Sequence, residues 1–264
     1  MGEAIVITSG KGGVGKSTTS ANLGTALALQ GKKVCLIDMD IGLRNLDVIL
    51  GLENRIVYDI VDVVAGRCKL HQALVKDKRF DGDLFLLPAA QNSDKDAITG
   101  DEMKTLIDSI REDYDYIILD CPAGIEQGFK NAIAGADRAI VVATPEISSV
   151  RDADRIIGLL EQQEMPAPKL IVNRIRVNMV EDGRSMTIED ITSHLSIELL
   201  GIILDDEAVI ESSNSGQPVV LSNTSKASIG YRNIARRIQG ESVPLMDIKE
   251  KKLGFFQRLF GKKA

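Results

Sequence analysis

Short apolar runs recur along the chain, and each ends in polar residues or glycine. Five of them are clear, at residues 4–8, 34–37, 116–119, 139–144 and 169–173. Two more, at 84–88 and 199–204, have the same character. Strands that are apolar on both faces and rich in Ile and Val are typical of parallel sheets that helices cover on both sides. The runs therefore predict a buried, mostly parallel β-sheet.

Segments of helical length lie between these runs, at 17–30, 101–112, 147–164, 188–195, 206–213 and 226–239. Glycines follow the first and the last of them, as they commonly do at helix ends. Alternation of strand and helix predicts an α/β fold with helices on both faces of the sheet and right-handed crossovers. In such folds the ligand binds at the carboxyl ends of the strands.

The chain has 264 residues, 44% of them hydrophobic, which suits one large domain better than two small ones. We expect this domain to span residues 1–240. Residues 241–252 lose the periodic pattern and contain Pro244, so they predict a linker. Residues 253–264 form a separate terminal element.

One glycine-rich segment follows the first apolar run directly and precedes the first helical segment. It matches the pattern G-x-x-x-x-G-K-[ST] at Gly10, Gly15, Lys16 and Ser17. In this motif the backbone N–H groups surround phosphate oxygens, the lysine binds the terminal phosphates and the hydroxyl binds Mg²⁺. The predicted nucleotide-binding residues are Gly10, Lys11, Gly12, Gly13, Val14, Gly15, Lys16, Ser17 and Thr18.

The same segment also fits a dinucleotide fingerprint. Gly10, Gly12 and Gly15 form G-x-G-x-x-G, and Asp38 ends the next apolar run, near where a ribose-binding acid stands in a nicotinamide-dependent oxidoreductase. Lys16 and Ser17 argue against that alternative, because such a fold needs small or apolar residues there for close packing of helix on sheet. The phosphate-loop interpretation is therefore favoured.

Acidic residues end two of the predicted strands. Asp38 and Asp40 follow the second apolar run, and Asp120 ends the run at 116–119 as the Walker B acid of P-loop NTPases does. Carboxylates beside Mg²⁺ and phosphate can organise the metal's water shell or orient an attacking water molecule. The alternative for the first pair is that both are solvated turn residues. Pro122 and Gly124 follow Asp120 in a loop that can sense the γ-phosphate, although a tight strand-to-helix turn would need the same glycine.

Three segments together show a family resemblance. KGGVGKST at residues 11–18 resembles the deviant Walker A box of the ParA/MinD class of ATPases, and IDMDIGLRNLD at 37–47 and LDCPAGIE at 119–126 resemble the septum-site-determining members of that class. The resemblance spans the whole chain. It implies an ATPase that uses ATP and Mg²⁺ and forms a homodimer on ATP. It also implies that the dimer recruits a division inhibitor resembling MinC to the membrane, and that a topological regulator of unknown identity is a further partner.

The resemblance also assigns roles to individual residues. It gives Lys11, Lys16 and Asp40 the catalytic roles, with Lys11 reaching the phosphates of the partner subunit and Asp40 positioning the water. Asp38 joins Ser17 and Asp120 on the metal side. Asn173, at the end of the run at 169–173, is assigned to the adenine base.

Charge is distributed unevenly along the chain. The formal net charge is −6, yet residues 249–264 contain six lysines and arginines against one glutamate. The rest of the chain is therefore acidic, which argues against a generally nucleic-acid-binding surface. Three cysteines without metal or redox spacing predict buried thiols in a reducing compartment and no metal cluster. The chain shows no signal peptide and no spanning segment, so we expect a cytoplasmic protein.

The terminal element predicts an amphipathic helix. At 100° per residue its apolar side chains occupy an arc of about 160°. They are Leu253, Phe255, Phe256, Leu259 and Phe260. Lysines flank the segment on both sides, as a helix lying in the interface of an anionic bilayer requires. We therefore expect peripheral binding to the inner face of the cell membrane.

Two alternatives stay open for this segment and for the function. The terminal helix could dock on the protein's own core instead of a membrane. The protein could also be a ParA-like partition ATPase that binds DNA as the ATP dimer. Such a protein needs a basic stripe on its folded body and has little use for phenylalanines clustered at a terminus, so the membrane interpretation is preferred.

Overall fold

The computed structural model describes residues 1–79, 83–94 and 96–246. Within these residues one eight-stranded sheet runs in the order β3-β4-β2-β5-β1-β6-β7-β8. All neighbouring strands are parallel except β3, which is antiparallel to β4. The strands are β1 (Glu3–Thr8), β2 (Val34–Asp38), β3 (Val75–Asp77), β4 (Leu84–Leu87), β5 (Tyr116–Asp120), β6 (Arg138–Ala143), β7 (Lys169–Ile175) and β8 (Glu198–Leu204).

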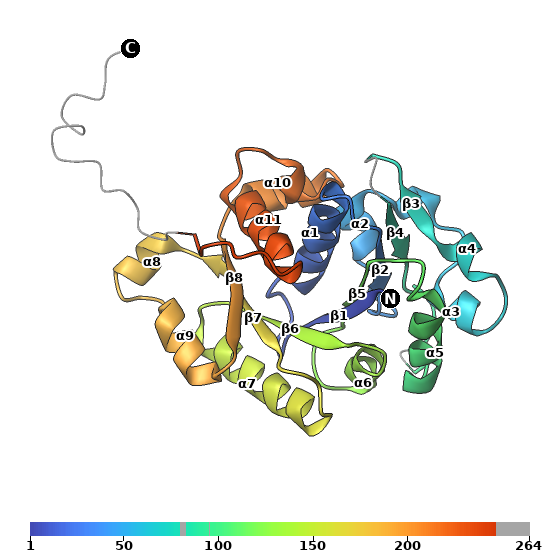
Figure 1. The fold of residues 1–264 in the computed structure, drawn as a ribbon, viewed down its shortest axis with the longest axis horizontal. Helices are drawn as coiled ribbons and strands as arrows, with labels where there is room; N and C mark the ends of the chain where they lie inside the picture. The colour runs from blue at the N-terminus through green and yellow to red at the C-terminus, as the bar shows by residue number, and fades with distance from the viewer. Residues whose placement is uncertain (80–82, 95, 247–264) are drawn as a thin grey trace, which may run out of the picture.

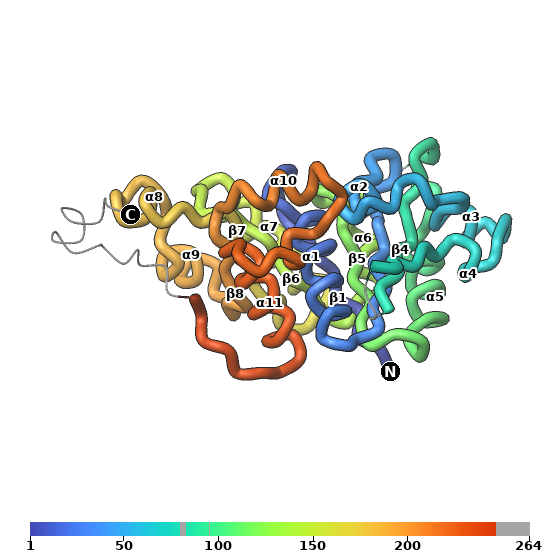
Figure 2. The backbone as a smooth tube through the Cα atoms, turned by 90° about the horizontal axis from the view of Figure 1, so that it is seen from above, coloured from blue at the N-terminus to red at the C-terminus, as the bar shows by residue number. Residues whose placement is uncertain are grey.

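Helices cover both faces of this sheet (Figure 1). They are α1 (Lys16–Leu29), α2 (Leu46–Leu50), α3 (Ile60–Val64), α4 (Leu70–Ala73), α5 (Gly100–Ile110), α6 (Gln127–Ile133), α7 (Ile147–Gln162), α8 (Val177–Glu181), α9 (Ile188–Leu195), α10 (Ala208–Asn214) and α11 (Lys226–Ile238). Two 3₁₀ turns, η1 (Glu53–Arg55) and η2 (Val219–Leu221), complete the set within the described residues. The molecule is elongated along the sheet, with α8 and α9 at one end and α3 and α4 at the other (Figure 2). No helix of the described residues is long and apolar enough to span a bilayer.

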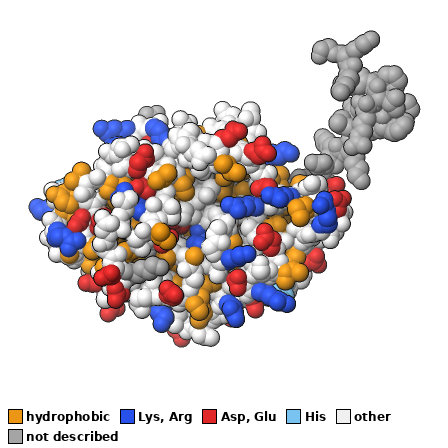
Figure 3. Space-filling view, turned by 180° about the vertical axis from the view of Figure 1, so that it is seen from behind, with side chains coloured by type: hydrophobic (Ala, Val, Ile, Leu, Met, Phe, Trp, Pro, Cys, Tyr) orange, Lys and Arg blue, Asp and Glu red, His pale blue; other side chains and the backbone are white. Residues whose placement is uncertain are grey.

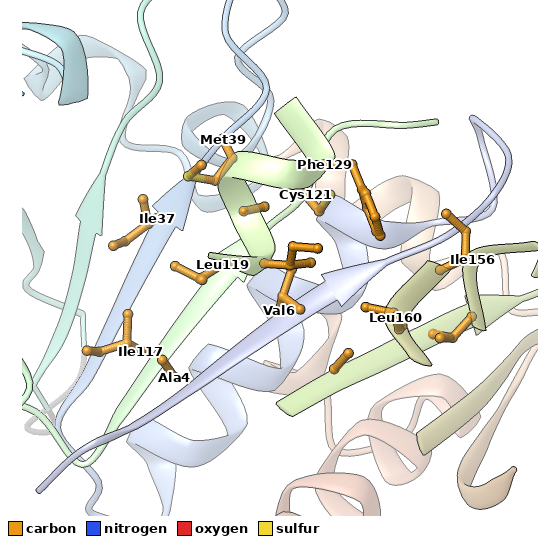
Figure 4. Close-up of a cluster of buried hydrophobic side chains, with 14 of the residues drawn as sticks. Ala4, Val6, Ile37, Met39, Ile117, Leu119, Cys121, Phe129, Ile156 and Leu160 are labelled. Carbon is orange, nitrogen blue, oxygen red and sulfur yellow. The ribbon is translucent and has the colours of Figure 1, made fainter. Parts of the chain in front are cut away.

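Alternate side chains of each central strand enter two separate hydrophobic layers. Ile5 and Ile7 of β1 face α1 and α11. Ala4 and Val6 of the same strand lie in the other layer, with α5, α6, α7 and α9. Figure 4 shows part of this second layer, including Phe129 of α6. Burial on both faces explains why the strand sequences are continuous apolar runs and do not alternate.

The predicted fold class is confirmed, and the seven predicted strands lie within a residue or two of their expected bounds. No pattern in the sequence predicted β3, because this edge strand has three residues and the middle one, Lys76, is exposed. The short helices between β2 and β4 were also missed, since four or five residues show no helical period. Cys35 and Cys121 are buried as expected, whereas Cys68, in the loop between α3 and α4, is partly exposed, so that expectation is wrong.

The chain is described only to the first part of the predicted linker. Helix α11 ends at Ile238, and Gly240 follows with a positive φ of 86°. Residues 241–246 form neither helix nor strand. The rest of the predicted linker and the predicted helix at 253–264 lie outside the described residues.

One arginine joins three elements at the edge of the sheet opposite the carboxyl ends. Arg111, directly after α5, is 7% exposed. Its guanidinium donates to the carbonyl oxygens of Gly2 and Gly135, at 3.3 and 2.8 Å, and to the carboxylates of Asp108 and Asp137. The side chain therefore holds the start of β1 and the turn before β6 against the end of α5.

We expect Arg111→Ala to destabilise the fold by about 2–3 kcal/mol, because two inward-facing carbonyl groups lose their donor. Urea unfolding measures this change. The control is Lys104→Ala on the same helix, which removes an exposed pair with Asp108 and should cost less than about 0.5 kcal/mol. ATP affinity should be unchanged in both variants. Equal, small losses of stability would contradict the structural role of Arg111.

Candidate nucleotide site

The predicted site residues gather at the carboxyl edge of the sheet. Strands β1, β2, β5 and β7 lead at this edge to the glycine-rich loop, to Asp38, to Asp120 and to Asn173. Asp38 and Asp120 are direct partners in the register of β2 and β5. The parallel topology thus brings together residues more than 100 positions apart, as the sequence predicted.

The glycine-rich loop has a backbone conformation and a close packing contact that residues with side chains could not adopt. Gly13 and Gly15 have φ values of 79° and 97°, which L-residues rarely adopt. A Cβ atom at Gly10 would lie 2.1 Å from the carbonyl oxygen of Asp152, so the loop packs directly on α7. A Cβ at Gly13 would meet nothing within 4 Å, so this glycine borders open space. One side of the loop therefore packs on α7, and the other side borders open space without side chains, as a phosphate site requires.

Lys16 begins α1 and is 8% exposed. Its Nζ donates to the Ser9 hydroxyl at 3.0 Å, and that hydroxyl donates to the Lys11 carbonyl at 2.8 Å. A buried ammonium group needs an anionic partner. The arrangement places a fixed positive charge at the start of α1, where the N–H groups of the first turn also favour an anion.

The acid pair lies beside this lysine. Asp38 is fully buried, and its two carboxylate oxygens accept backbone N–H bonds from Asp40, Asn45 and Leu46 at 3.0–3.1 Å. Asp120 is 1% exposed and accepts a bond of 2.9 Å from the Ser20 hydroxyl.

Burial raises the pKa of both carboxyl groups. Repulsion from Asp38 raises the pKa of Asp120 further, and repulsion from Asp40 raises that of Asp38. Hydrogen bonds from Ser17 and Ser20 lower the pKa of Asp120. Two buried carboxylates next to a serine hydroxyl supply hard oxygen donors and an excess of negative charge. Both properties suit Mg²⁺, which offsets the repulsion. Ser17, Asp120 and Asp38 are therefore the residues that fit this metal.

Asp40 lies two residues beyond β2 in the loop that Asp38 holds, and it is half-buried. It borders a cavity of about 150 Å³ together with Pro122 and the start of α6. Gly124, with a φ of 97°, turns the other loop at this cavity. The loops that follow Asp38 and Asp120 in the chain therefore share one small space, and a water molecule fits there.

Lys11 is exposed and leans toward α7. Its Nζ donates to the Ser148 hydroxyl at 3.2 Å and lies 3.8 Å from a carboxylate oxygen of Glu146. Contacts of this kind at the surface are worth no more than about 1 kcal/mol, so a stronger anion can redirect the side chain.

A cavity of about 460 Å³ opens next to Gly15 and Thr18, within the usual size range of ligand sites. The loop after β7 and the segment at 203–210 form most of its wall, and Asn173, 4% exposed, contributes its side chain. Leu204 and Asp206 line the cavity as well. Asp206 is engaged elsewhere, because it accepts a bond of 2.7 Å from Ser225 and its pKa is lowered by this and by backbone bonds despite burial.

Some residues of this cavity were not expected from the sequence. Tyr231 of α11 is 1% exposed and lines it from a helix almost 60 residues beyond Asn173. Arg174 and Arg176 line it from β7 and the residue that follows. A tyrosine inside an amphipathic helix has the pattern of an ordinary core residue, so no signal in the sequence marked it. The predicted membrane residues 253–260 lie outside the described part of the chain.

Comparisons with known proteins show the family of this chain. The model of the CobQ/CobB/MinD/ParA nucleotide binding domain matches residues 5–219. The septum site-determining protein MinD of Bacillus subtilis is 64% identical over 98% of this chain and 97% of its own length.

Solved structures give the same result. The chain is similar to one in a MinC:MinD cell division protein complex of Aquifex aeolicus, with a TM-score of 0.86, 52% identity and coverage of 93% of this chain and 98% of that one. MinD of Pyrococcus horikoshii, complexed with Mg-ADP, has a TM-score of 0.81 and 30% identity over 90% of this chain and 96% of its own. The chain therefore belongs to the MinD family of ParA/MinD nucleotide-binding proteins.

Proposed function

We propose that this protein is an ATPase that dimerises on ATP, binds the membrane as a dimer and recruits a division inhibitor there to position the division site. The observation that carries the proposal is a complete phosphate loop with a buried acid pair beside it and a second lysine, Lys11, exposed at its rim. The high identity to MinD proteins over nearly the whole chain supports the cellular role.

The residues of the site divide the chemistry among themselves. Loop amides and Lys16 bind the β- and γ-phosphates, and Asn173 lines the cavity that the adenine base would occupy. Bound Mg²⁺ would be held by Ser17, Asp120 and Asp38, and it would neutralise charge on the phosphates. Asp40 orients the attacking water at the cavity it shares with the loop after β5. Phosphoryl transfer depends mostly on such positioning and charge neutralisation.

Lys11 gives the dimer its dependence on ATP. The surface contacts of its ammonium group are weak, so a stronger anion can replace them, and the phosphates of a second subunit would supply one across the interface. Each nucleotide then contributes to both subunits. Loss of the γ-phosphate on hydrolysis weakens this contact and releases the dimer.

Membrane binding follows from the dimer. A short amphipathic helix binds a bilayer weakly, with an association constant on the order of 10⁴ M⁻¹ for a comparable single anchor. Two copies on one dimer gain roughly 10²- to 10⁴-fold through effective concentration. Membrane binding by the terminal segment then depends on the bound nucleotide. The dimer brings a partner resembling MinC to the inner face of the membrane; MinC is present with MinD in the Aquifex aeolicus complex.

DNA binding is the second candidate function, and the surface gives it little support. Basic and acidic side chains both occur across the face in Figure 3, so no basic stripe covers it. The net charge of −6 also disfavours contact with phosphate backbones. A nicotinamide-dependent activity has less support still, because Lys16 and Ser17 occupy positions that a dinucleotide fold keeps small or apolar.

Asp40→Ala and Lys16→Ala should fail in different ways. The first change removes a group that acts on water, so ATP affinity should stay within about threefold of wild type while turnover falls about 10²-fold. The second change removes a phosphate contact, so ATP affinity itself should fall. Binding of a fluorescent ATP analogue and phosphate release measure the two effects. An equal loss of affinity in both variants would refute the role given to Asp40.

Phe256→Glu should abolish ATP-dependent co-sedimentation with anionic vesicles and leave dimerisation on ATP intact, because it places a charge in the middle of the predicted apolar arc. Gln257→Glu adds the same charge on the polar side of the segment and serves as the matched control. Its vesicle binding should fall only slightly. If monomeric protein bound vesicles as tightly as the dimer does, the link between nucleotide and membrane would be disproved.

A further inference from the structure

We infer that Asn173 is a positioning residue for the phosphate loop, so that one amide group connects the base cavity to the groups that bind phosphate. This inference rests on the proposed nucleotide site. It goes beyond contact with the base, because it gives Asn173 a role toward ligands that have no base.

The contacts of the amide group carry the inference. Asn173 Nδ2 donates to the carbonyl oxygen of Val14 in the phosphate loop, with a distance of 2.8 Å. Its Oδ1 accepts from the backbone N–H of Arg174 at 2.9 Å. A buried carbonyl without a donor costs about 1–3 kcal/mol, so the bond to Val14 holds the loop in one conformation.

The backbone of β7 is irregular next to the contact between Asn173 and Val14. The register of β7 with β8 shifts between Val172 and Ile175, and Arg174 has a left-handed φ of 57°. A non-glycine residue rarely adopts that conformation, which costs free energy unless its surroundings stabilise it. The strand thus departs from regular geometry at the point where Asn173 contacts the loop.

Gly15, in the phosphate loop, leaves room for the amide group of Asn173. A Cβ atom at this position would lie 2.5 Å from Asn173 Nδ2, so only glycine allows the amide to pack against the loop. Lys16 follows Gly15 directly and begins α1. A displacement of the Val14 carbonyl would therefore move the first phosphate-binding groups of the helix.

The amide retains the capacity to bind a ligand as well. A primary amide has two N–H groups and two acceptor lone pairs. The bonds to Val14 and Arg174 use one of each. One donor and one acceptor are left for a ligand in the cavity that Asn173 lines, and a base bound there would order the same side chain that supports the loop.

The test compares ATP with inorganic tripolyphosphate, each with Mg²⁺, by calorimetric titration of the full chain. Wild type should bind both. Asn173→Ala should weaken tripolyphosphate binding roughly five- to tenfold, the effect of one lost hydrogen bond, and ATP binding by at least as much. Asn173→Asp keeps the shape but places an oxygen against the Val14 carbonyl, and it should weaken both ligands more than Asn173→Ala does.

Ile210→Ala is the control, because Ile210 lines the same cavity, is 65% exposed and belongs to α10, not to the phosphate loop. It should leave tripolyphosphate affinity unchanged. Amide hydrogen exchange at residues 13–17 should be faster in Asn173→Ala than in wild type and unchanged in Ile210→Ala, while both variants keep a cooperative thermal transition.

The outcomes distinguish the positioning role of Asn173 from the existence of the nucleotide site. Wild-type affinity for tripolyphosphate and wild-type exchange at residues 13–17 in Asn173→Ala would overturn the positioning role and leave the nucleotide site in place. Failure of the wild-type protein to bind Mg-ATP would overturn the nucleotide site itself.

Discussion

Two carboxylates lie side by side in the interior of this protein, and the functional edge of the sheet is arranged around them. Asp38 and Asp120 are both essentially inaccessible to solvent and are register partners on adjacent strands. Burial raises the pKa of each group, and repulsion from Asp38 raises that of Asp120 further, so the ionised pair is unfavourable without a cation. Lys16 supplies one positive charge nearby, and Mg²⁺ is the natural second.

Asp38 of the acid pair also connects the loop after β2 to the site. Asp38 accepts backbone bonds from Asp40, Asn45 and Leu46, so one buried side chain fixes the loop after β2 and the start of α2. Leu43, which is 63% exposed, lies in the same loop. A change at the metal and phosphates can therefore reach the surface through one short segment whose backbone is anchored at its inner end.

The sequence predicted the parts of the structure that depend on local patterns. Continuous apolar runs marked the strands, and the spacing of Gly10, Gly15 and Lys16 marked the phosphate loop. Contacts between distant segments could not be predicted in the same way. The bond of Asn173 to Val14 depends on an irregular turn in β7, and the place of Tyr231 depends on how α11 packs on α1. Neither geometry leaves a periodic signal in the chain.

The central claim is that each active site is completed by Lys11 of the other subunit. Mixing two inactive variants tests it directly, with ATP hydrolysis as the readout. In a mixed dimer of Lys11→Ala and Asp40→Ala, the site with intact Asp40 can receive its lysine only from the partner subunit. The account predicts that the mixture hydrolyses ATP well above the residual rate of either variant alone, with at most one active site per mixed dimer. A mixture no more active than the average of the two variants would contradict it.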